Sequence, residues 1–223
     1  MDSIFVELDS NIPRYACTAC NKCSSKFGHS LCYISNRGCC WYFPKFTLVE
    51  IQRMLKTDEG RGILEQIISN PNTVFYSSYI HAKGFFDELG YNLWKTKPDA
   101  KYPEDSSYLF KACPFVKKDK GCILPPRYRT IVCNFYLCDE LLSQTDQVQA
   151  EIYITERTRY ASWFYRENRE LESILRDNHV CLKTDRDQSF KILSSLEIYE
   201  YDFPILSPMY IGSDFDGFFF KGA

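Results

Sequence analysis

The sequence predicts a mainly α protein, built as a single domain with a loop-built cysteine metal site and a long C-terminal helix. Three observations predict this class. The segment from Gln147 to Arg176 carries one continuous helical pattern, and two shorter segments after residue 47 repeat apolar residues at helical spacing. The cysteine-rich segment 17–40 is instead dominated by Ser, Asn, Gly and Lys. We expect that segment to be a loop whose conformation is fixed by ligation.

The composition is that of a globular protein. The chain has 223 residues, 45% of them hydrophobic and 16% aromatic, enough for one domain with a sizeable core. The net charge is −2 and the pI is about 6.0, whereas nucleic-acid-binding domains are usually basic. The start, MDSIFVELDS, lacks the regions of a secretory signal, and no run reaches the ~20 apolar residues of a membrane helix. We therefore expect a cytoplasmic protein without membrane or nucleic-acid partners.

The first elements follow from alternation and from capping chemistry. Ile4, Val6 and Leu8 alternate with other residues and predict a short strand. Thr47 has the chemistry of a helix N-cap, with Glu50 three residues on as its capping-box partner. The apolar stripe of the helix that follows comprises Leu48, Ile51, Met54 and Leu55.

The middle of the chain predicts a second helix and a surface loop. Gly62–Ser69 has three apolar residues at helical spacing, and Asn70-Pro71 would end the helix. Residues 73–95 are rich in aromatics but have no clear period. Residues 96–107 are polar with two prolines, which predicts a loop.

The long helical segment dominates the C-terminal part. From Gln147 to Arg176 it would measure about 45 Å at 1.5 Å per residue. A last helix is predicted over Ser189–Tyr201, and the sequence FDGFFFKGA at the end is an apolar segment that must dock or mark an interface. We divide the chain into a cysteine-cluster part, residues 1–140, and a helical part, residues 141–223, packed on it. The predicted inward face of the long helix is Tyr153, Tyr160, Phe164, Leu171 and Ile174.

Cysteines form the strongest signal in the sequence. The chain has 11, and six of them lie in residues 17–40. An odd number and a reducing compartment argue against a disulfide framework and favour metal binding or redox chemistry. We expect the fold to bring two sets together as one composite metal site, and we leave Cys181 out as a small buried side chain. The predicted ligands are Cys17, Cys20, Cys23, Cys32, Cys39, Cys40, Cys113, Cys122, Cys133 and Cys138.

The spacing favours an iron–sulfur cluster, with zinc as the alternative. Cys17, Cys20 and Cys23 form a C-x2-C-x2-C run that can wrap one face of a 4Fe–4S cubane, and Cys113-Pro114 can supply a remote ligand. Zinc needs two short cysteine pairs, which Cys20/Cys23 and Cys133/Cys138 provide. The number of thiols also permits two sites.

Cations near the second set support a thiolate site, because positive charge stabilises thiolate. His29 lies inside the first set and is either a ligand or a polar loop residue. His81 could act as a base, and His179 follows the long helix; both are also explained without a function. The only GxG, Gly60-Arg61-Gly62, lacks the context of a cofactor loop. The cations concerned are Lys111, Lys117, Lys118, Lys120, Arg127 and Arg129.

Two longer stretches resemble a known family. GCCWYFPKFTLVEIQRM, followed at a distance by ACPFVKKDKGCILPPRYRTIVCNF, resembles the YkgJ-type cysteine-cluster family, which is described as zinc- or iron-chelating. The resemblance covers about residues 17–138, with Thr130 where the family has proline and Asn134 where it has arginine. The cysteine cluster of flagellin lysine N-methylase is similar to this family. The family's motif positions correspond to Cys39 and Cys40, Cys113-Pro114, Gly121-Cys122, and Arg129 with Cys133.

The sequence thus predicts a cysteine-ligated metal-binding protein of the YkgJ type, with a 4Fe–4S cluster or zinc as cofactor and room for a protein partner. An alternative that the resemblance implies is a cluster-dependent enzyme similar to lysine methyltransferases. Another alternative is a zinc-scaffolded protein-interaction module. No residue stands out as catalytic.

Overall fold

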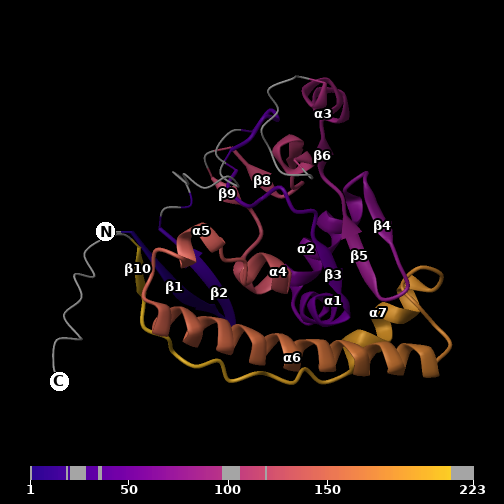
Figure 1. The fold of residues 1–223 in the computed structure, drawn as a ribbon. Helices are drawn as coiled ribbons and strands as arrows, with labels where there is room; N and C mark the ends of the chain where they lie inside the picture. Colours follow the sequence, from indigo (N-terminus) through magenta and orange to yellow (C-terminus); the bar gives the residue numbers. More distant parts are fainter. Residues whose placement is uncertain are drawn as a thin grey trace, which may run out of the picture.

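The fold, seen in a computed structural model, mixes helices and strands (Figure 1). The structure describes residues 2–18, 20, 29–34, 37–96, 106–118 and 120–211. Helices take up 44% of these residues and strands 19%, so the predicted mainly α class is wrong. Most of the strands are only two to four residues long. Strands of that length are too short to show alternation in a sequence.

The N-terminal region forms an antiparallel sheet with the end of the described chain. The strands β1 (Asp2–Asp9) and β2 (Ile12–Cys17) form a hairpin, and β10 (Met209–Ile211) pairs with the other edge of β1. Ser10 and Asn11 both have positive φ, 50° and 62°, as a tight two-residue hairpin turn requires. The short strand predicted at Ile4–Leu8 is confirmed, within a longer β1.

A second antiparallel sheet has the order β3-β5-β4. Its strands are β3 (Lys45–Thr47), β4 (Thr73–Phe75) and β5 (Tyr79–Ala82). The aromatic segment without a clear period therefore contains two of these strands, whose alternate residues point to opposite faces. Two further ladders pair β6 (Phe85–Phe86) with β7 (Lys111–Ala112) and β8 (Val116–Lys117) with β9 (Gly121–Cys122).

Two predicted helices form next to the second sheet. Helix α1 (Leu48–Leu55) has the predicted capping box of Thr47 and Glu50. Helix α2 (Asp58–Ser69) begins four residues before the predicted start, because the Thr57 side chain accepts a hydrogen bond from the backbone N–H of Gly60 and caps the helix there. The other helices are α3 (Glu88–Lys95), η2 (Ser107–Phe110), η3 (Pro126–Tyr128), α4 (Ile131–Asn134), α5 (Asp139–Leu142), α6 (Gln147–Asp177) and α7 (Arg186–Ser195).

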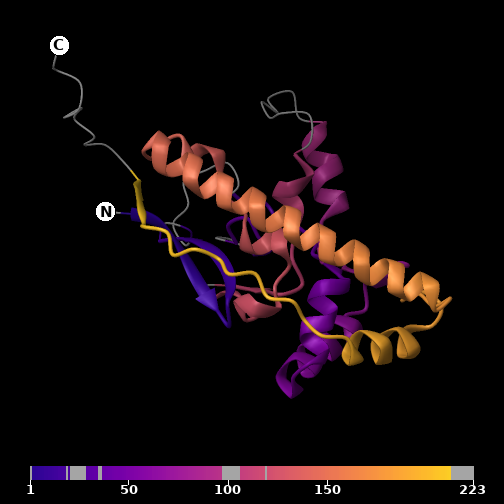
Figure 2. The same cartoon turned by 90° about the horizontal axis from the view of Figure 1, so that it is seen from below.

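The long helix α6 is confirmed with 31 residues. It runs along one side of the molecule, with the N-terminal sheet near one end and α7 near the other (Figure 1). Helix α7 ends at Ser195, earlier than predicted, because Leu196 is extended. From there the chain runs back along α6 to β10 (Figure 2). The apolar segment FDGFFFKGA lies outside the described residues.

One hydrophobic core joins the two predicted parts of the chain. It contains residues from Ile4 to Met209, including α1 residues such as Ile51 and α6 residues such as Phe164. The predicted inward residues Tyr153, Tyr160, Phe164 and Leu171 are buried, whereas Ile174 is only half-buried and Leu175 takes the inward place. Among the described residues, no helix has both the length and the apolar character needed to cross a membrane.

Candidate metal centre

Four cysteines far apart in the sequence are positioned by different elements. Cys40 follows the turn at Gly38, where φ is +56°. Cys113 follows β7, and its backbone N–H donates a hydrogen bond to the carbonyl of Cys40 at 2.8 Å. Cys122 lies in β9, opposite Val116 of β8. Cys133 lies in α4, where Thr130 caps the helix through the Cys133 N–H. Short ladders and turns thus hold these backbones.

The thiols of these four cysteines lie close enough to affect one another's charge. Burial raises the pKa of Cys113, and the charges of Cys133, Cys40 and Cys122 raise it further. Burial raises the pKa of Cys133 to about 12, with Cys122 and Cys40 adding to the effect against a hydrogen bond to Thr130. Burial also raises the pKa of Cys122, although Arg129 lowers it. We call Cys40, Cys113, Cys122 and Cys133 the thiol cluster.

Cys39 and Cys40 behave as a pair. The hydrogen bond between their thiols raises the pKa of Cys39 and lowers that of Cys40. Burial raises the pKa of Cys39 as well, and the charges of Cys20 and Cys133 contribute. Cys20, from the first predicted set, therefore lies near this pair. Of the four clustered thiols, Cys40 is the one with a lowered pKa and the readiest to become a thiolate.

Three arginines lie close to the Cys40 thiol. Arg129, Arg37 and Arg14 each lower the pKa of Cys40. Arg14 is also paired with Glu7 at 2.8 Å, so its charge is already balanced. Arg129 uses Nε to donate to the carbonyl of Leu124 at 2.7 Å. Among the described residues, no carboxylate forms an ion pair with Arg129 or Arg37.

The other predicted ligands are placed differently. The Cys32 thiol donates to the carbonyls of Lys111 and Ile34, at 3.7 and 3.8 Å. Cys138 is buried, and no described interaction joins its thiol to the cluster. Cys17 lies at the end of β2, and Cys23 lies outside the described residues. The two predicted sets are thus brought together only in part.

The thiol cluster is not a finished metal site. In the part of the chain that the structure describes, no three Cys, His, Asp or Glu side chains are placed so that they could hold a metal ion. The predicted fold class included a preformed, loop-built metal site, and this part of the prediction is therefore wrong. The physical reason is that strands, a helix cap and turns fix these backbones, and this leaves the described thiols without a common point at which three of them could bind a metal ion.

Other predicted residues have partners elsewhere. Arg127 pairs with Asp9 at 2.6 Å and with Glu59, so the partner expected for it is a carboxylate pair and not the cluster. Lys117, Lys118 and Lys120 are exposed, as on a solvated face. The Cys181 thiol lies 3.2 Å from the hydroxyl of Thr184.

The three histidines do not join the cysteines through their rings in any described contact. The backbone carbonyl of His29 accepts a hydrogen bond from Arg37. His81 lies in β5, tilted against the ring of Tyr76 at 6.5 Å, and burial lowers its pKa. His179 has a φ of +58° just after α6, which agrees with its reading as a helix-end residue.

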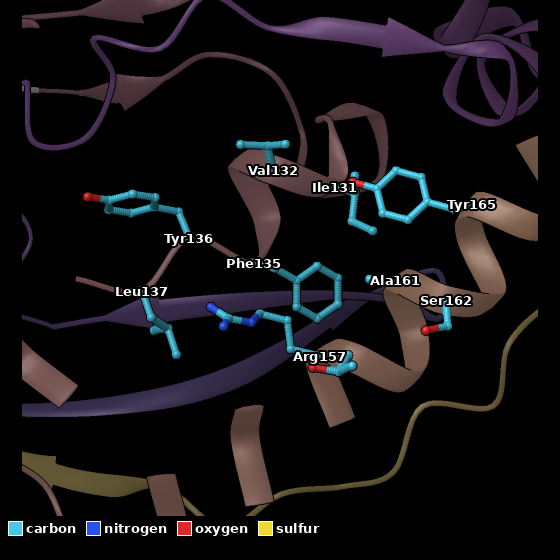
Figure 3. A pocket seen from close by; sticks show the side chains of 10 residues that line it. Ile131, Val132, Phe135, Tyr136, Leu137, Arg157, Ala161, Ser162 and Tyr165 are labelled. Atoms are coloured by element: carbon cyan, nitrogen blue, oxygen red, sulfur yellow. The ribbon is translucent and has the colours of Figure 1, made fainter. Parts of the chain in front are cut away.

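A groove that the sequence did not indicate lies between α4 and α6 (Figure 3). Its volume is about 570 Å³. Arg157 from α6 points into it toward Phe135 and Leu137 (Figure 3). Cys133 is not a lining residue, although its neighbours on α4 are. The groove is lined by Ile131, Val132, Phe135, Tyr136, Leu137, Arg157, Thr158, Ala161, Ser162 and Tyr165.

Comparisons with known proteins leave the family open. A scan against models of protein families, a search of curated proteins and a search of solved structures each found no match to this chain. The resemblance to the YkgJ-type family therefore stays a prediction from the motifs around Cys39, Cys113, Cys122 and Cys133.

Proposed function

We propose that this chain binds a metal through cysteine thiolates, as an iron–sulfur cluster or as zinc. The observation that carries the proposal is the thiol cluster itself. Cys40, Cys113, Cys122 and Cys133 come from four separate segments, and their thiols interact electrostatically in the folded chain. All four are free cysteines in the structure.

The chemistry of the donors fits such a group. Thiolate is a soft ligand that selects zinc, copper(I) or iron–sulfur clusters. Four thiolates leave a zinc site, or an oxidised 4Fe–4S cluster, with a net charge of about −2. Arg37 and Arg129 lie beside the Cys40 thiol and carry positive charge that no described carboxylate balances. A negative centre would therefore be stabilised at this place.

The residues would hold the metal by giving up thiol protons and turning toward one another. Cys40 is the first to ionise, because Cys39 donates a hydrogen bond to it and the arginines favour its charge. A bound iron–sulfur cluster would supply one-electron chemistry, whereas bound zinc would supply folding energy. Cys17, Cys20 and Cys23 remain as candidates for the same centre or for a second one.

The first prediction concerns the identity of the metal. We expect protein purified without oxygen to be brown, with iron and acid-labile sulfide bound and with visible absorption that bleaches on reduction. Cys113→Ala and Cys20→Ala should each lose this colour, measured as iron per chain. Cys181→Ser is the matched control and should keep it, because Cys181 contacts Thr184 and not the cluster.

Two results would count against this assignment. Colourless protein with stoichiometric zinc would show that the bound metal is zinc and not an iron–sulfur cluster. That result favours the alternative of a zinc-scaffolded module that binds a protein partner. Protein that takes up neither zinc nor iron, even after reduction and reconstitution, would overturn metal binding as the function.

One observation favours an enzyme as the second candidate. The groove between α4 and α6 has a volume of about 570 Å³, within the usual range of small-molecule sites. The groove is lined by Ile131 and Val132 of α4, the helix that also carries Cys133. If the chain is a cluster-dependent methyltransferase, S-adenosylmethionine should raise its melting temperature, and Arg157→Ala should abolish the shift. The absence of a shift in the metal-loaded wild type would remove this candidate.

A further inference from the structure

Arg37 is a buried arginine inside the cysteine segment. Only 3% of its surface is exposed. Its two terminal nitrogens donate to backbone carbonyls, one to Gly38 at 2.8 Å and the other to Tyr108 at 2.5 Å and His29 at 3.3 Å. These bonds tie the segment before Cys39 to η2.

The charge of Arg37 is not balanced by the groups described around it. Its Nε–H is buried without a hydrogen-bond partner, and within the described chain no carboxylate forms an ion pair with it. Arg14 and Arg127, by contrast, both have carboxylate partners. A buried guanidinium without a counter-charge is strongly unfavourable, and an unsatisfied Nε–H adds to that cost.

The groups that do surround Arg37 are thiols. Its charge interacts with Cys32, Cys40 and Cys39, and its backbone carbonyl accepts a hydrogen bond from the N–H of Cys40 at 3.1 Å. Neutral thiols are weak acceptors and carry no charge. Thiolates that bind a metal are permanent anions. Arg37 is therefore arranged to meet negative charge that the cysteines carry only when they are ionised.

We propose that Arg37 is the internal counter-charge of the metal–thiolate centre, a role that rests on the proposed function. Together with Arg129, which also lacks an ion pair among the described residues, it supplies two positive charges. A four-thiolate zinc site or an oxidised 4Fe–4S cluster carries about −2. Arg37 thus acts as a positioning residue: it stabilises the thiolates through charge and holds the Cys39–Cys40 turn against η2.

The test is a comparison of metal-loaded and metal-free protein for the wild type, Arg37→Gln and Arg37→Lys. Metal-loaded Arg37→Gln should bind zinc at least about tenfold more weakly in competition with a chelator, as is usual when an outer partner of a metal site is removed. Metal-free Arg37→Gln should melt at or above the temperature of the metal-free wild type, because an unbalanced buried charge is gone. Arg37→Lys should keep more of the zinc affinity than Arg37→Gln.

Each other outcome decides against the role. Equal zinc affinity in Arg37→Gln and the wild type would overturn it and leave the proposed function standing. Equal losses of stability with and without metal would make Arg37 a structural residue only. If the metal-free chain does not fold, the zinc affinities of Arg37→Lys and Arg37→Gln decide the question. Both variants lose the guanidinium, but only Arg37→Gln loses the positive charge. Equal zinc affinities of the two variants would then overturn the role. A wild type that binds neither zinc nor iron overturns the proposed function itself.

Arg53→Gln, which removes a half-buried arginine bonded to Tyr160, is the matched control and should leave zinc affinity unchanged.

Discussion

Glu50 connects the start of α1 to the start of α4 through one buried carboxylate. Only 2% of it is exposed. Oε2 accepts hydrogen bonds from the backbone N–H and the hydroxyl of Thr47, both at 2.6 Å, and Oε1 accepts one from the backbone N–H of Ile131 at 2.9 Å. The capping box of α1 therefore also holds the first residue of the helix that carries Cys133. Burial raises the pKa of Glu50, while these hydrogen bonds lower it.

We predict that Glu50→Gln destabilises the protein at low pH and that this loss shrinks as pH rises. The side chain of glutamine has an NH2 group in place of one carboxylate oxygen. One of the hydrogen-bond donors around Glu50 would then face another donor, which costs about 1–3 kcal/mol. A carboxyl with a raised folded-state pKa contributes stability below its unfolded pKa of about 4.3, and the contribution is lost as pH rises through the folded pKa. Since glutamine does not titrate, the gap between variant and wild type should narrow from about pH 4 upward.

Urea unfolding of both reduced proteins between about pH 4 and about pH 7 measures this difference. Glu65→Gln changes an exposed glutamate on α2 and should show no comparable trend with pH. A gap for Glu50→Gln that stays constant over the range would show that burial does not raise the pKa of Glu50.

At the scale of residues, the sequence indicated which cysteines could form a site, but it did not indicate which side chains surround their thiols. Cysteine is rare, so a dense run such as 17–40 is visible without any fold. The roles of Arg37 and Arg129 depend on which segments of the chain pack around them, and the sequence does not show this packing. Arg37 lies in a polar stretch, SNRGCC, that gives no sign of burial. Cys138 shows the converse, because its spacing from Cys133 suggested a ligand pair that the described contacts do not form.

At the scale of elements, the junction of α1 and α2 depends on a glycine. A Cβ atom at Gly60 would lie 2.3 Å from the carbonyl oxygen and 2.7 Å from the Cα of Met54. The short connection through Lys56 and Thr57 brings the first turn of α2 against the end of α1. Gly62, two residues on in the same helix, is exposed and would meet no atom within 4 Å. The two glycines therefore form a matched pair.

We predict opposite effects for alanine at these positions. Gly60→Ala should destabilise the protein by about 1–3 kcal/mol, because backbone atoms must move apart to accept the methyl group. Gly62→Ala should stabilise it by up to about 1 kcal/mol, because alanine is the better helix former and meets open space. Chemical denaturation of the two variants and the wild type measures both values. Stabilisation by Gly60→Ala would contradict the close packing of α2 on Met54.

The elements that could be predicted are those with local signals. The capping box and apolar stripe of α1, the long period of α6 and the alternation in β1 all lie within one stretch of chain. The start of α2 was misplaced because glycines at 60 and 62 look like a break, whereas Thr57 caps the helix before them. The short strands β4 to β9 form because partners elsewhere complete their ladders, and no local pattern carries that information.

At the scale of the whole molecule, the chain closes on itself next to α6. The hydroxyl of Tyr153 donates to the carbonyl of Ser207 at 2.9 Å, and that of Tyr15 donates to the carbonyl of Tyr153 at 2.6 Å. Tyr15 also packs against Phe135, with ring centroids 4.9 Å apart. The hairpin, α6, the returning chain and the segment after α4 thus share one aromatic core. None of these contacts is made by a cysteine.

The last prediction follows from that separation. If metal joins the thiol cluster, its removal should loosen the segments around Cys40, Cys113 and Cys122, which are linked by ladders of two residues and by turns. Helix α6 and the β1–β2 hairpin should keep their protection, because they are held by aromatic packing that includes Tyr153 and Phe164, each 1% exposed. Hydrogen exchange measured by mass spectrometry on metal-loaded and verified metal-free protein tests this. We expect faster exchange in residues 29–34, 37–44, 106–118 and 120–123 after removal, with α6 unchanged, since ligation energy is folding energy for the segments that hold the ligands. Identical exchange in both forms, together with an unchanged melting temperature, would show that any bound metal does not hold the fold together.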